Sequence, residues 1–426
     1  MGMNVIVLSL ALPSHIMVVL KVAKRLISKG VHHVTIVTTE EARDNILRIP
    51  NSQSSNISFE FFSDGLSLDN DRIDREEVIN SLETKGSKNL SSLISTLTKT
   101  REYSCMIISG VFHWATNIGV EHGIPCALLW IGSSSVFSIC YRYFKGINVF
   151  PVEDLNENVR IPGLPTSFEV KWVIGISIYE IEEEVVKSIA SLTPFYTIGP
   201  LVSPFLLGKK ETNDDNVNNV HMWYAEDSCI EWLDNKPSTS VIYVSFGSLV
   251  VLSKKEIHNL AMALKNINKP FLWVLNPSKK DCVEELPPEF LQDTKGMGLV
   301  VKWCNQERVL RHPSVACFVS HGGFSSIMET IVAGVPVVCL PYFSDHPTNA
   351  MLITNVFGNG VRIKCGEDCV VSAEEFERCI WEVTDGPNAR KIKNNALEMK
   401  KLARKASQEG GSADNNIGQF INEIMK

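Results

Sequence analysis

Short apolar runs alternate along the chain with longer segments in which apolar residues recur at helical spacing. Residues 5–12 and 34–38 are such runs, and the segment 14–28 between them has apolar residues three and four positions apart. Two more apolar runs follow at residues 106–109 and 127–131. Strands separated by helices predict a parallel sheet covered by helices, in which ligands bind beside the carboxyl ends of the strands.

The second half of the chain repeats this pattern. A helix is predicted from residue 254, because Ser253 and Glu256 have the spacing of a capping box. The apolar runs predicted as strands in this half are residues 241–245, 271–275, 299–302, 315–319 and 336–340. We therefore expect an α/β protein with two Rossmann-like domains, each built on a parallel sheet.

The boundary between the halves is predicted from a charged, asparagine-rich stretch without periodicity at residues 209–219. A chain of 426 residues is long enough to bury two cores of ordinary domain size. We expect a first domain over residues 1–202, a linker over 203–225 and a second domain over 226–408. The final segment, 409–426, is predicted to contain an amphipathic helix at residues 417–425.

Composition argues against several classes of function and location. The chain has 41 basic and 48 acidic residues and no basic stripe, which argues against nucleic acid as a partner. No run of about 18 uncharged apolar residues occurs, so we expect no integral membrane segment. The apolar start lacks a preceding basic region and a small-residue cleavage site, so it predicts a buried strand rather than a signal peptide. These features favour a cytoplasmic protein.

The cysteines and the acidic residues do not predict a metal site. Eleven cysteines scattered along a long chain are typical of reduced thiols, and Cys365 and Cys369 lack a histidine nearby. Asp69-Asn70-Asp71 resembles an aspartate pair that binds manganese in other enzymes, but its charged surroundings are typical of a solvated loop. No G-x-G-x-x-G follows a predicted strand, which argues against a nicotinamide or flavin cofactor.

The most informative stretch surrounds a strand, a glycine turn and a helix. The run 315–319 stops at Ser320-His321-Gly322-Gly323, and a helical pattern follows over residues 324–333. Glycines let the backbone approach a ligand closely, and the start of a helix favours an anion such as phosphate. A turn of this kind occurs in many α/β proteins, so alone it does not identify a phosphate site.

Side chains near the turn extend this prediction to a nucleotide. Ser325 and Ser326 bring hydroxyls to the start of the helix. Glu329 lies four residues after Ser325 on the same helix face, where its carboxylate can accept hydrogen bonds from the hydroxyls of a ribose. Trp303 can supply a flat surface for a base.

The segment 303–346 resembles the signature box of plant family 1 UDP-dependent glycosyltransferases, which transfer a sugar from a UDP-sugar to a small acceptor. The matching residues are Trp303, Gln306, Val309, Leu310, His312, Phe318, His321, Gly323, Ser326, Glu329, Gly334, Val335, Pro336, Pro341 and Asp345. The resemblance implies the metal-independent, inverting GT-B fold, a UDP-sugar as co-substrate without a cofactor, a small aromatic acceptor and a monomer.

The resemblance also implies a set of donor-site residues. His321 and the helix start would stabilise the departing diphosphate, while Asp345 and His346 would hold sugar hydroxyls. The residues expected to bind the UDP-sugar are Ser248, Trp303, Cys304, Gln306, His321, Gly323, Phe324, Ser325, Ser326, Glu329, Asp345 and His346.

Four positions depart from the usual signature. Gly322 replaces a cysteine, Phe324 a tryptophan that touches the sugar, Ser325 an asparagine and His346 the final glutamine. Histidine at this last position occurs in some galactose-using members, so galactose is an alternative to the glucose that we expect.

The first domain departs from the family at its catalytic base. His15, in Leu12-Pro13-Ser14-His15, resembles that base, although a histidine at a helix start also fits a capping or solvent-facing role. The aspartate that normally holds it is replaced by Gly110. A neutral imidazole with a pKa near 6.5 is a weak base toward a phenol of pKa about 10, whereas a carboxylic acid of pKa about 4 is already ionised.

We therefore expect glucosyl transfer to an aromatic carboxylic acid or an acidic, flavonoid-like phenol. Residues 130–144 and 228–237 resemble the branch that contains glucose-ester-forming and flavonoid-modifying members. Carbon-glycosylation, galactosyl transfer and a non-catalytic UDP-sugar-binding protein are the alternatives. Two features favour the binding protein: Gly110, and a segment before Lys171 that is shorter than in the family. The retained His15 argues against it.

Overall fold

The computed structural model describes residues 2–47, 55–70, 72, 74–147, 170–209, 228–275, 286–366 and 370–426. The described residues form two compact units, which are treated separately. Of the described residues, unit 1 contains those up to Leu201 together with Lys405–Lys426, and unit 2 contains those between Val202 and Arg404. Most of the predicted linker, Asp71 and Cys369 lie outside the described residues.

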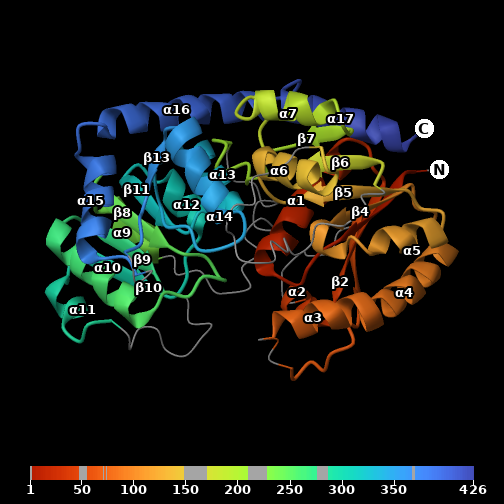
Figure 1. The fold of residues 1–426 in the computed structure, drawn as a ribbon, viewed down its shortest axis with the longest axis horizontal. Coiled ribbons are helices and arrows are strands. Elements are labelled where there is room, and N and C mark those ends of the chain that lie inside the picture. The colour runs from red at the N-terminus through yellow and green to blue at the C-terminus, as the bar shows by residue number, and fades with distance from the viewer. Residues whose placement is uncertain are drawn as a thin grey trace. The chain divides into compact units, whose positions relative to one another are not determined.

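Unit 1 is built on a parallel sheet of seven strands in the order β3-β2-β1-β4-β5-β6-β7 (Figure 1). The strands are β1 (Asn4–Leu8), β2 (His33–Thr39), β3 (Ile57–Phe62), β4 (Cys105–Ser109), β5 (Cys126–Trp130), β6 (Trp172–Gly175) and β7 (Phe195–Thr197). The helices are α1 (Pro13–Ser28), α2 (Arg43–Leu47), α3 (Arg75–Ser81), α4 (Ser87–Thr100), α5 (Ala115–Glu121), α6 (Ser134–Phe144), α7 (Glu183–Ala190) and α17 (Ser412–Ile424). Short 3-10 or π-helical turns lie at Glu40–Ala42, Leu82–Gly86 and Gly110–Phe112.

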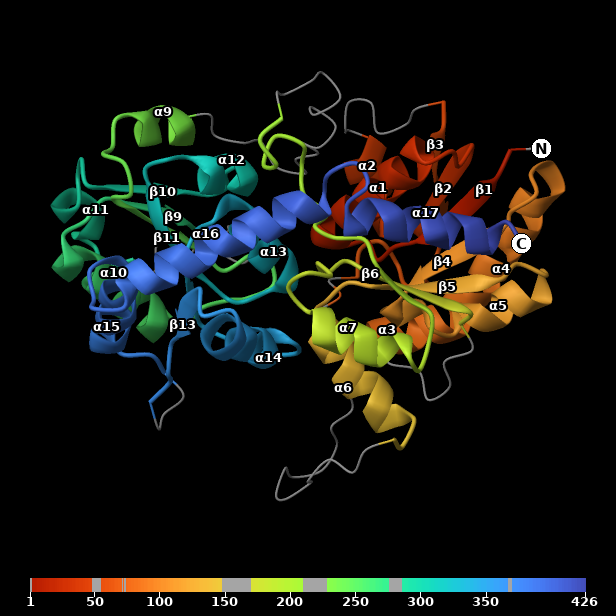
Figure 2. The same cartoon turned by 90° about the horizontal axis from the view of Figure 1, so that it is seen from above.

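Both faces of this sheet are buried, which explains why its strands are almost continuously apolar. Ile6 and Leu8 of β1 join a hydrophobic cluster with Ile94 of α4, Ile118 of α5 and Phe137 of α6. Helix α1 contacts β2, helix α17 contacts β7, and the two helices lie side by side (Figure 2). Helices therefore enclose the sheet, as the alternating pattern predicted.

The last helix, α17, is an integral part of unit 1. Phe420 is fully buried, and its ring meets Trp172 of β6 edge-on at 6.2 Å. The Asn416 side-chain amide donates to the carbonyl oxygen of Thr197 at 2.8 Å, and Lys29 pairs with Asp414 at 2.6 Å. Apolar packing, a hydrogen bond to a strand and an ion pair thus hold the end of the chain.

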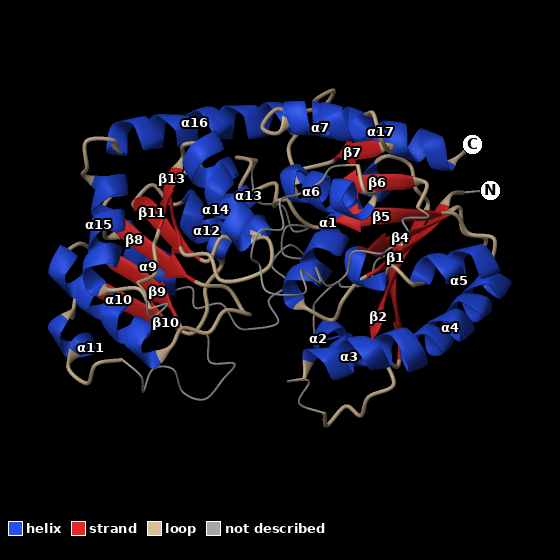
Figure 3. Ribbon diagram, in the orientation of Figure 1, coloured by secondary structure: helices blue, strands red, loops and turns tan. Residues whose placement is uncertain are grey.

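Unit 2 has a second parallel sheet, with six strands in the order β10-β9-β8-β11-β12-β13. Its strands are β8 (Val241–Ser245), β9 (Phe271–Val274), β10 (Gly298–Val301), β11 (Val315–Ser320), β12 (Val337–Cys339) and β13 (Gly360–Arg362). Its helices are α9 (Ser228–Asp234), α10 (Lys254–Ile267), α11 (Phe290–Asp293), α12 (Gln306–Arg311), α13 (Phe324–Ala333), α14 (His346–Met351), α15 (Ala373–Thr384) and most of α16 (Ala389–Ala406), with a π-helical turn at Leu352–Val356. Figure 3 shows the strands of each unit flanked by helices.

Several predicted bounds agree with the structure and several need correction. The capping box of Ser253 and Glu256 is present, with both of its hydrogen bonds. The first strand was predicted to reach residue 12 but ends at Leu8, because the chain turns before Pro13, whose fixed φ suits the first turn of α1. The final helix starts at Ser412, five residues before the predicted position at residue 417.

Candidate functional site

The turn between β11 and α13 leaves the first N–H groups of the helix without a side-chain cap. Gly323 is the N-cap residue, no described side chain bonds to this end, and the first turn contains no acidic residue. Gly322 has a φ of +83°, and a Cβ on it would lie 2.6 Å from the sulfur of Cys339. The glycines therefore permit a tight turn that presents free backbone donors, which is an arrangement suited to an anion.

The imidazole of His321 lies between two glycines. A Cβ on Gly247 would be 2.8 Å from its Cε1, and a Cβ on Gly323 would be 2.4 Å from its Nε2. Burial, with a smaller contribution from His346, lowers the pKa of His321 to about 3. His321 is therefore neutral at pH 7, and its interaction with an anion would begin as a hydrogen bond rather than as an ion pair.

Asp345 and His346 lie beside this turn. The His346 ring meets His321 edge-on with centroids 4.9 Å apart, and its buried Nδ1 has no hydrogen-bond partner among the described residues. Burial is also the main cause of the lowered pKa of His346. The amide of Asn349 donates to the carbonyl oxygen of Gly322 at 3.0 Å and to Oδ2 of Asp345 at 2.7 Å. This amide fixes the Asp345 carboxylate relative to the turn.

A hydrogen-bond network joins α12 to α13. Nε2 of Gln306 donates to Oγ of Ser326 at 3.0 Å and to Oε2 of Glu329 at 2.6 Å. The hydroxyl of Tyr243, on β8, donates to Oε1 of Gln306 at 3.2 Å. The structure thus brings three predicted donor-site residues together and adds Tyr243, which the sequence did not indicate.

The remaining donor-site residues differ in exposure. Trp303 is half-buried just before α12, and Ser325 is half-buried in the first turn of α13. Ser248 is exposed in the loop after β8. Cys304 and Phe324 are each only 4% exposed, so their side chains belong to the interior of unit 2.

His15 is the predicted site residue of unit 1. It is half-buried in the first turn of α1, and its Nδ1 has no hydrogen-bond partner among the described residues. Burial lowers the pKa of His15 to about 4. No carboxylate of the described residues bonds to Nδ1, so no ion pair at this atom stabilises the protonated imidazole.

Two further polar atoms lack partners at the same edge of the sheet of unit 1. Thr38 and Ser109 stand at the carboxyl ends of β2 and β4, which pair with β1 on its two sides. Oγ1 of Thr38 and Oγ of Ser109 are buried without a hydrogen-bond partner in the part of the chain that the structure describes. Buried polar atoms are normally paired, so this edge suits a polar group of a ligand or solvent.

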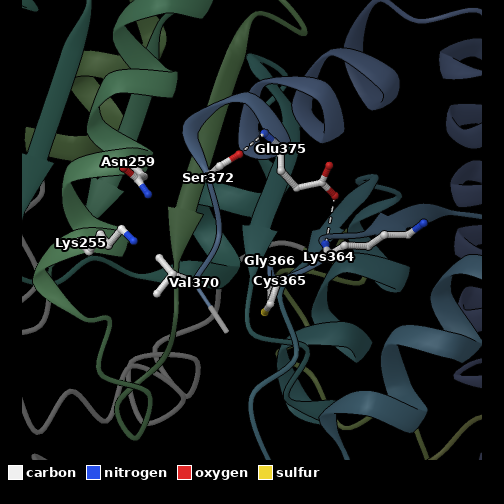
Figure 4. A pocket seen from close by; sticks show the side chains of 8 residues that line it. All are labelled: Lys255, Asn259, Lys364, Cys365, Gly366, Val370, Ser372 and Glu375. Atoms are coloured by element: carbon white, nitrogen blue, oxygen red, sulfur yellow. Dashed lines mark hydrogen bonds between the residues drawn. The ribbon is translucent and has the colours of Figure 1, made fainter. Parts of the chain in front are cut away.

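A surface pocket of about 360 Å³ lies elsewhere in unit 2, beside the starts of α10 and α15 (Figure 4). It is lined by Lys255, Asn259, Lys364, Cys365, Gly366, Val370, Ser372 and Glu375. Glu375 accepts a hydrogen bond from the backbone N–H of Lys364 at 3.0 Å and pairs with Arg378 at 2.7 Å. The pocket shares no residue with the predicted donor site, and its carboxylate is already paired.

Neither a bilayer-spanning helix nor a cluster of metal-binding side chains occurs among the described residues. No helix there has the length and apolar character needed to span a bilayer. No three histidine, cysteine, aspartate or glutamate side chains are grouped there so that they could hold a metal ion. All nine cysteines in the described ranges are unbridged.

Comparison with known proteins identifies the family. Residues 213–407 match the family model described as "UDP-glucoronosyl and UDP-glucosyl transferase". UDP-glycosyltransferase 84B2 of Arabidopsis thaliana is 38% identical over 98% of this chain and 99% of its own length. A gallate 1-beta-glucosyltransferase of Quercus robur is 34% identical over 96% of this chain and 87% of its own.

Solved structures agree with this assignment. The crystal structure of Os79 from O. sativa in complex with UDP matches 99% of this chain and 100% of its own, with a TM-score of 0.85 and 26% identity. Two parallel, helix-covered sheets and relatives that match over nearly the whole length lead to one conclusion. The chain belongs to the plant family 1 UDP-dependent glycosyltransferases and is a glycosyltransferase with the GT-B fold of two Rossmann-like domains.

Proposed function

We propose that this enzyme transfers glucose from UDP-glucose to the carboxylate of a small aromatic acid and forms a glucose ester. A carboxylate oxygen attacks the anomeric carbon from the face opposite UDP. The bond between that carbon and the phosphate oxygen breaks, and UDP leaves with the electron pair. The configuration at the anomeric carbon is inverted, and the step needs no cofactor besides the sugar nucleotide.

The state of His15 carries this proposal. Its pKa of about 4 lies about six units below that of a phenol, which corresponds to about 8 kcal/mol for the proton transfer. A base this weak cannot take the proton of an unactivated hydroxyl efficiently. An aromatic acid has already lost its proton at neutral pH, so the missing carboxylate partner of His15 does not hinder its reaction.

The donor side rests on the turn before α13. Its uncapped N–H groups and the hydroxyl of Ser326 fit a diphosphate, and the carboxylate of Glu329 fits the ribose hydroxyls. Trp303, half-buried next to α12, would stack on the uracil. A neutral His321 would donate a hydrogen bond to the departing phosphate oxygen, and Asp345, held by Asn349, would accept from the sugar.

The relatives support an acid as acceptor. The Quercus robur protein, 34% identical to this chain, is named for glucosyl transfer to gallate, which is an aromatic acid. Flavonoid-like phenols remain the second acceptor class, because a sufficiently acidic phenol is also partly ionised near pH 7.

The test is an acceptor screen with UDP-glucose at pH 7. Substituted benzoates, acidic polyphenols and simple alcohols are compared, and products are separated by mass spectrometry before and after hydroxylamine treatment, which cleaves esters. We expect hydroxylamine-sensitive hexosides of the benzoates. If simple alcohols react and benzoates do not, the proposal is wrong.

The same screen tests which sugar the enzyme transfers. UDP-galactose is run in parallel, because the buried Nδ1 of His346 lies without a partner among the described residues where most of the family has glutamine. We expect UDP-glucose to give the higher kcat/KM, and a preference for UDP-galactose would overturn the glucose assignment alone.

A further inference from the structure

Tyr243 is a buried residue that no part of the proposed reaction uses. It lies in the middle of β8, only 1% exposed, with its ring stacked on that of Phe318 at a centroid distance of 4.7 Å. Burial, with a smaller contribution from Cys304, raises the pKa of Tyr243 well above its ordinary value. The hydroxyl therefore keeps its proton and remains a donor throughout the working pH range.

The hydroxyl of Tyr243 reaches the donor site through one amide. It donates to Oε1 of Gln306 at 3.2 Å, while the sulfur of Cys304 lies 3.4 Å from the same hydroxyl oxygen. A thiol can donate to that oxygen while the tyrosine gives its own hydrogen to the amide. Cys304, Tyr243 and Gln306 then form a chain of hydrogen bonds that leads toward α13.

Beyond the amide, the chain divides toward the two groups proposed to hold the nucleotide. Nε2 of Gln306 donates one hydrogen to Oγ of Ser326 and one to Oε2 of Glu329. Because Ser326 accepts here, its own hydrogen can point to an acceptor at the start of α13, where the diphosphate is proposed to lie. A flipped amide would set Oε1 against the Glu329 carboxylate at 2.6 Å, and two acceptor oxygens cannot form a hydrogen bond with each other.

We propose that Tyr243 is a positioning residue for the sugar nucleotide. Its hydroxyl holds the Gln306 amide so that Ser326 donates to the diphosphate and the Glu329 carboxylate is set for the ribose. The inference rests on the proposed function of the donor site and adds to it a residue that does not touch the nucleotide.

The conservative test is Tyr243→Phe, which keeps the ring on Phe318 and removes only the hydroxyl. The dissociation constant of UDP is measured by titration calorimetry, and KM and kcat are measured with UDP-glucose. Loss of one buried neutral hydrogen bond predicts a rise of about 3- to 10-fold in the Kd of UDP and in the KM of UDP-glucose. We expect kcat to change less than about twofold, because the attack at the sugar does not involve this network.

A double-mutant cycle with Gln306→Leu separates positioning from general loosening of unit 2. Gln306→Leu alone should raise the Kd of UDP at least as much as Tyr243→Phe does. If Tyr243 acts through the amide, its substitution in the Gln306→Leu background should change the Kd by less than about 1.5-fold. The matched control is Tyr103→Phe in unit 1, where the lost hydroxyl is bonded to Oγ1 of Thr35 at 3.0 Å, and we expect it to leave the Kd unchanged.

Each outcome decides the matter. The role of Tyr243 would be overturned if Gln306→Leu left the Kd of UDP unchanged, or if the two substitutions had additive effects on that Kd. A fall in the kcat of Tyr243→Phe at constant KM would overturn it too. Unchanged UDP binding in Tyr243→Phe would overturn it as well. Absence of UDP binding to the wild-type protein is a different result, because it refutes the donor site itself.

Discussion

The dependence of the rate on pH separates an enzyme that needs a base from one that uses ionised acceptors. The perturbation is a change from pH 6 to pH 8 for two acceptors of similar size, a benzoate and a phenol. His15 has a pKa of about 4, so it is already almost entirely neutral at pH 6 and adds no slope of its own. The change of kcat/KM with pH therefore reports the ionisation of the acceptor.

The expected magnitudes follow from the two acceptor pKa values. A carboxylic acid of pKa about 4 is roughly 99% ionised at pH 6 and fully ionised at pH 8, so its kcat/KM should be flat. A phenol of pKa about 10 is ionised to about one part in 10⁴ at pH 6 and about one part in 10² at pH 8. Its kcat/KM should rise about 100-fold over the same range.

The assay measures initial rates of glucoside formation by chromatography at saturating UDP-glucose, every half pH unit. The KM of UDP-glucose is measured at each pH, so that ionisation of the donor does not enter the slope. A phenol profile that levels off between pH 6 and 7 would reveal a working base with an ordinary histidine pKa. That result would refute the reasoning built on His15.

Three further changes are predicted. Gly110→Asp should place a carboxylate where the family has one, raise the pKa of His15 and raise phenol turnover at pH 7 about tenfold, with benzoate turnover unchanged in the same assay. Gly323→Ala would put a methyl group 2.4 Å from Nε2 of His321 and should raise the Kd of UDP by at least about tenfold in calorimetry, whereas Gly418→Ala, whose methyl group meets no atom within 4 Å, should not. Because the pKa of His321 is lowered to about 3, the unfolded state binds more protons between about pH 6.5 and 3. The free energy of unfolding measured in urea should therefore fall by about 2 kcal/mol from this residue between pH 7 and 5, and a His321→Gln variant that shows the same fall would contradict this.

The sequence predicted best those elements whose pattern is strong. The strand at 241–245 and the helix at 324–333 were predicted with the bounds that β8 and α13 have, because a buried parallel strand is continuously apolar and glycine or serine marks the ends. Strands β6, β7 and β13 were missed. They have only three or four residues, so they show no period, and their pairing with a neighbouring strand alone defines them.

Within the donor site, spacing predicted neighbours along one helix but not contacts between elements. Ser326 and Glu329 share α13, and the resemblance added Gln306. That Tyr243 completes this network depends on the β8–β11 pairing and on the position of α12, neither of which local sequence encodes. The only local signal was a polar-tipped aromatic residue within a run of valine and isoleucine, a pattern that ordinary core strands also show.

The division of unit 1 into two distant stretches of chain has a consequence for its synthesis. The sheet can form once Leu201 has left the ribosome, but the surface around Trp172 stays uncovered until Phe420 arrives. At about 5–20 residues per second, the roughly 200 intervening residues take roughly 10–40 s to translate. During that interval the nascent chain exposes an apolar surface, so the yield of folded protein in the cell should depend on chaperones and on the speed of elongation.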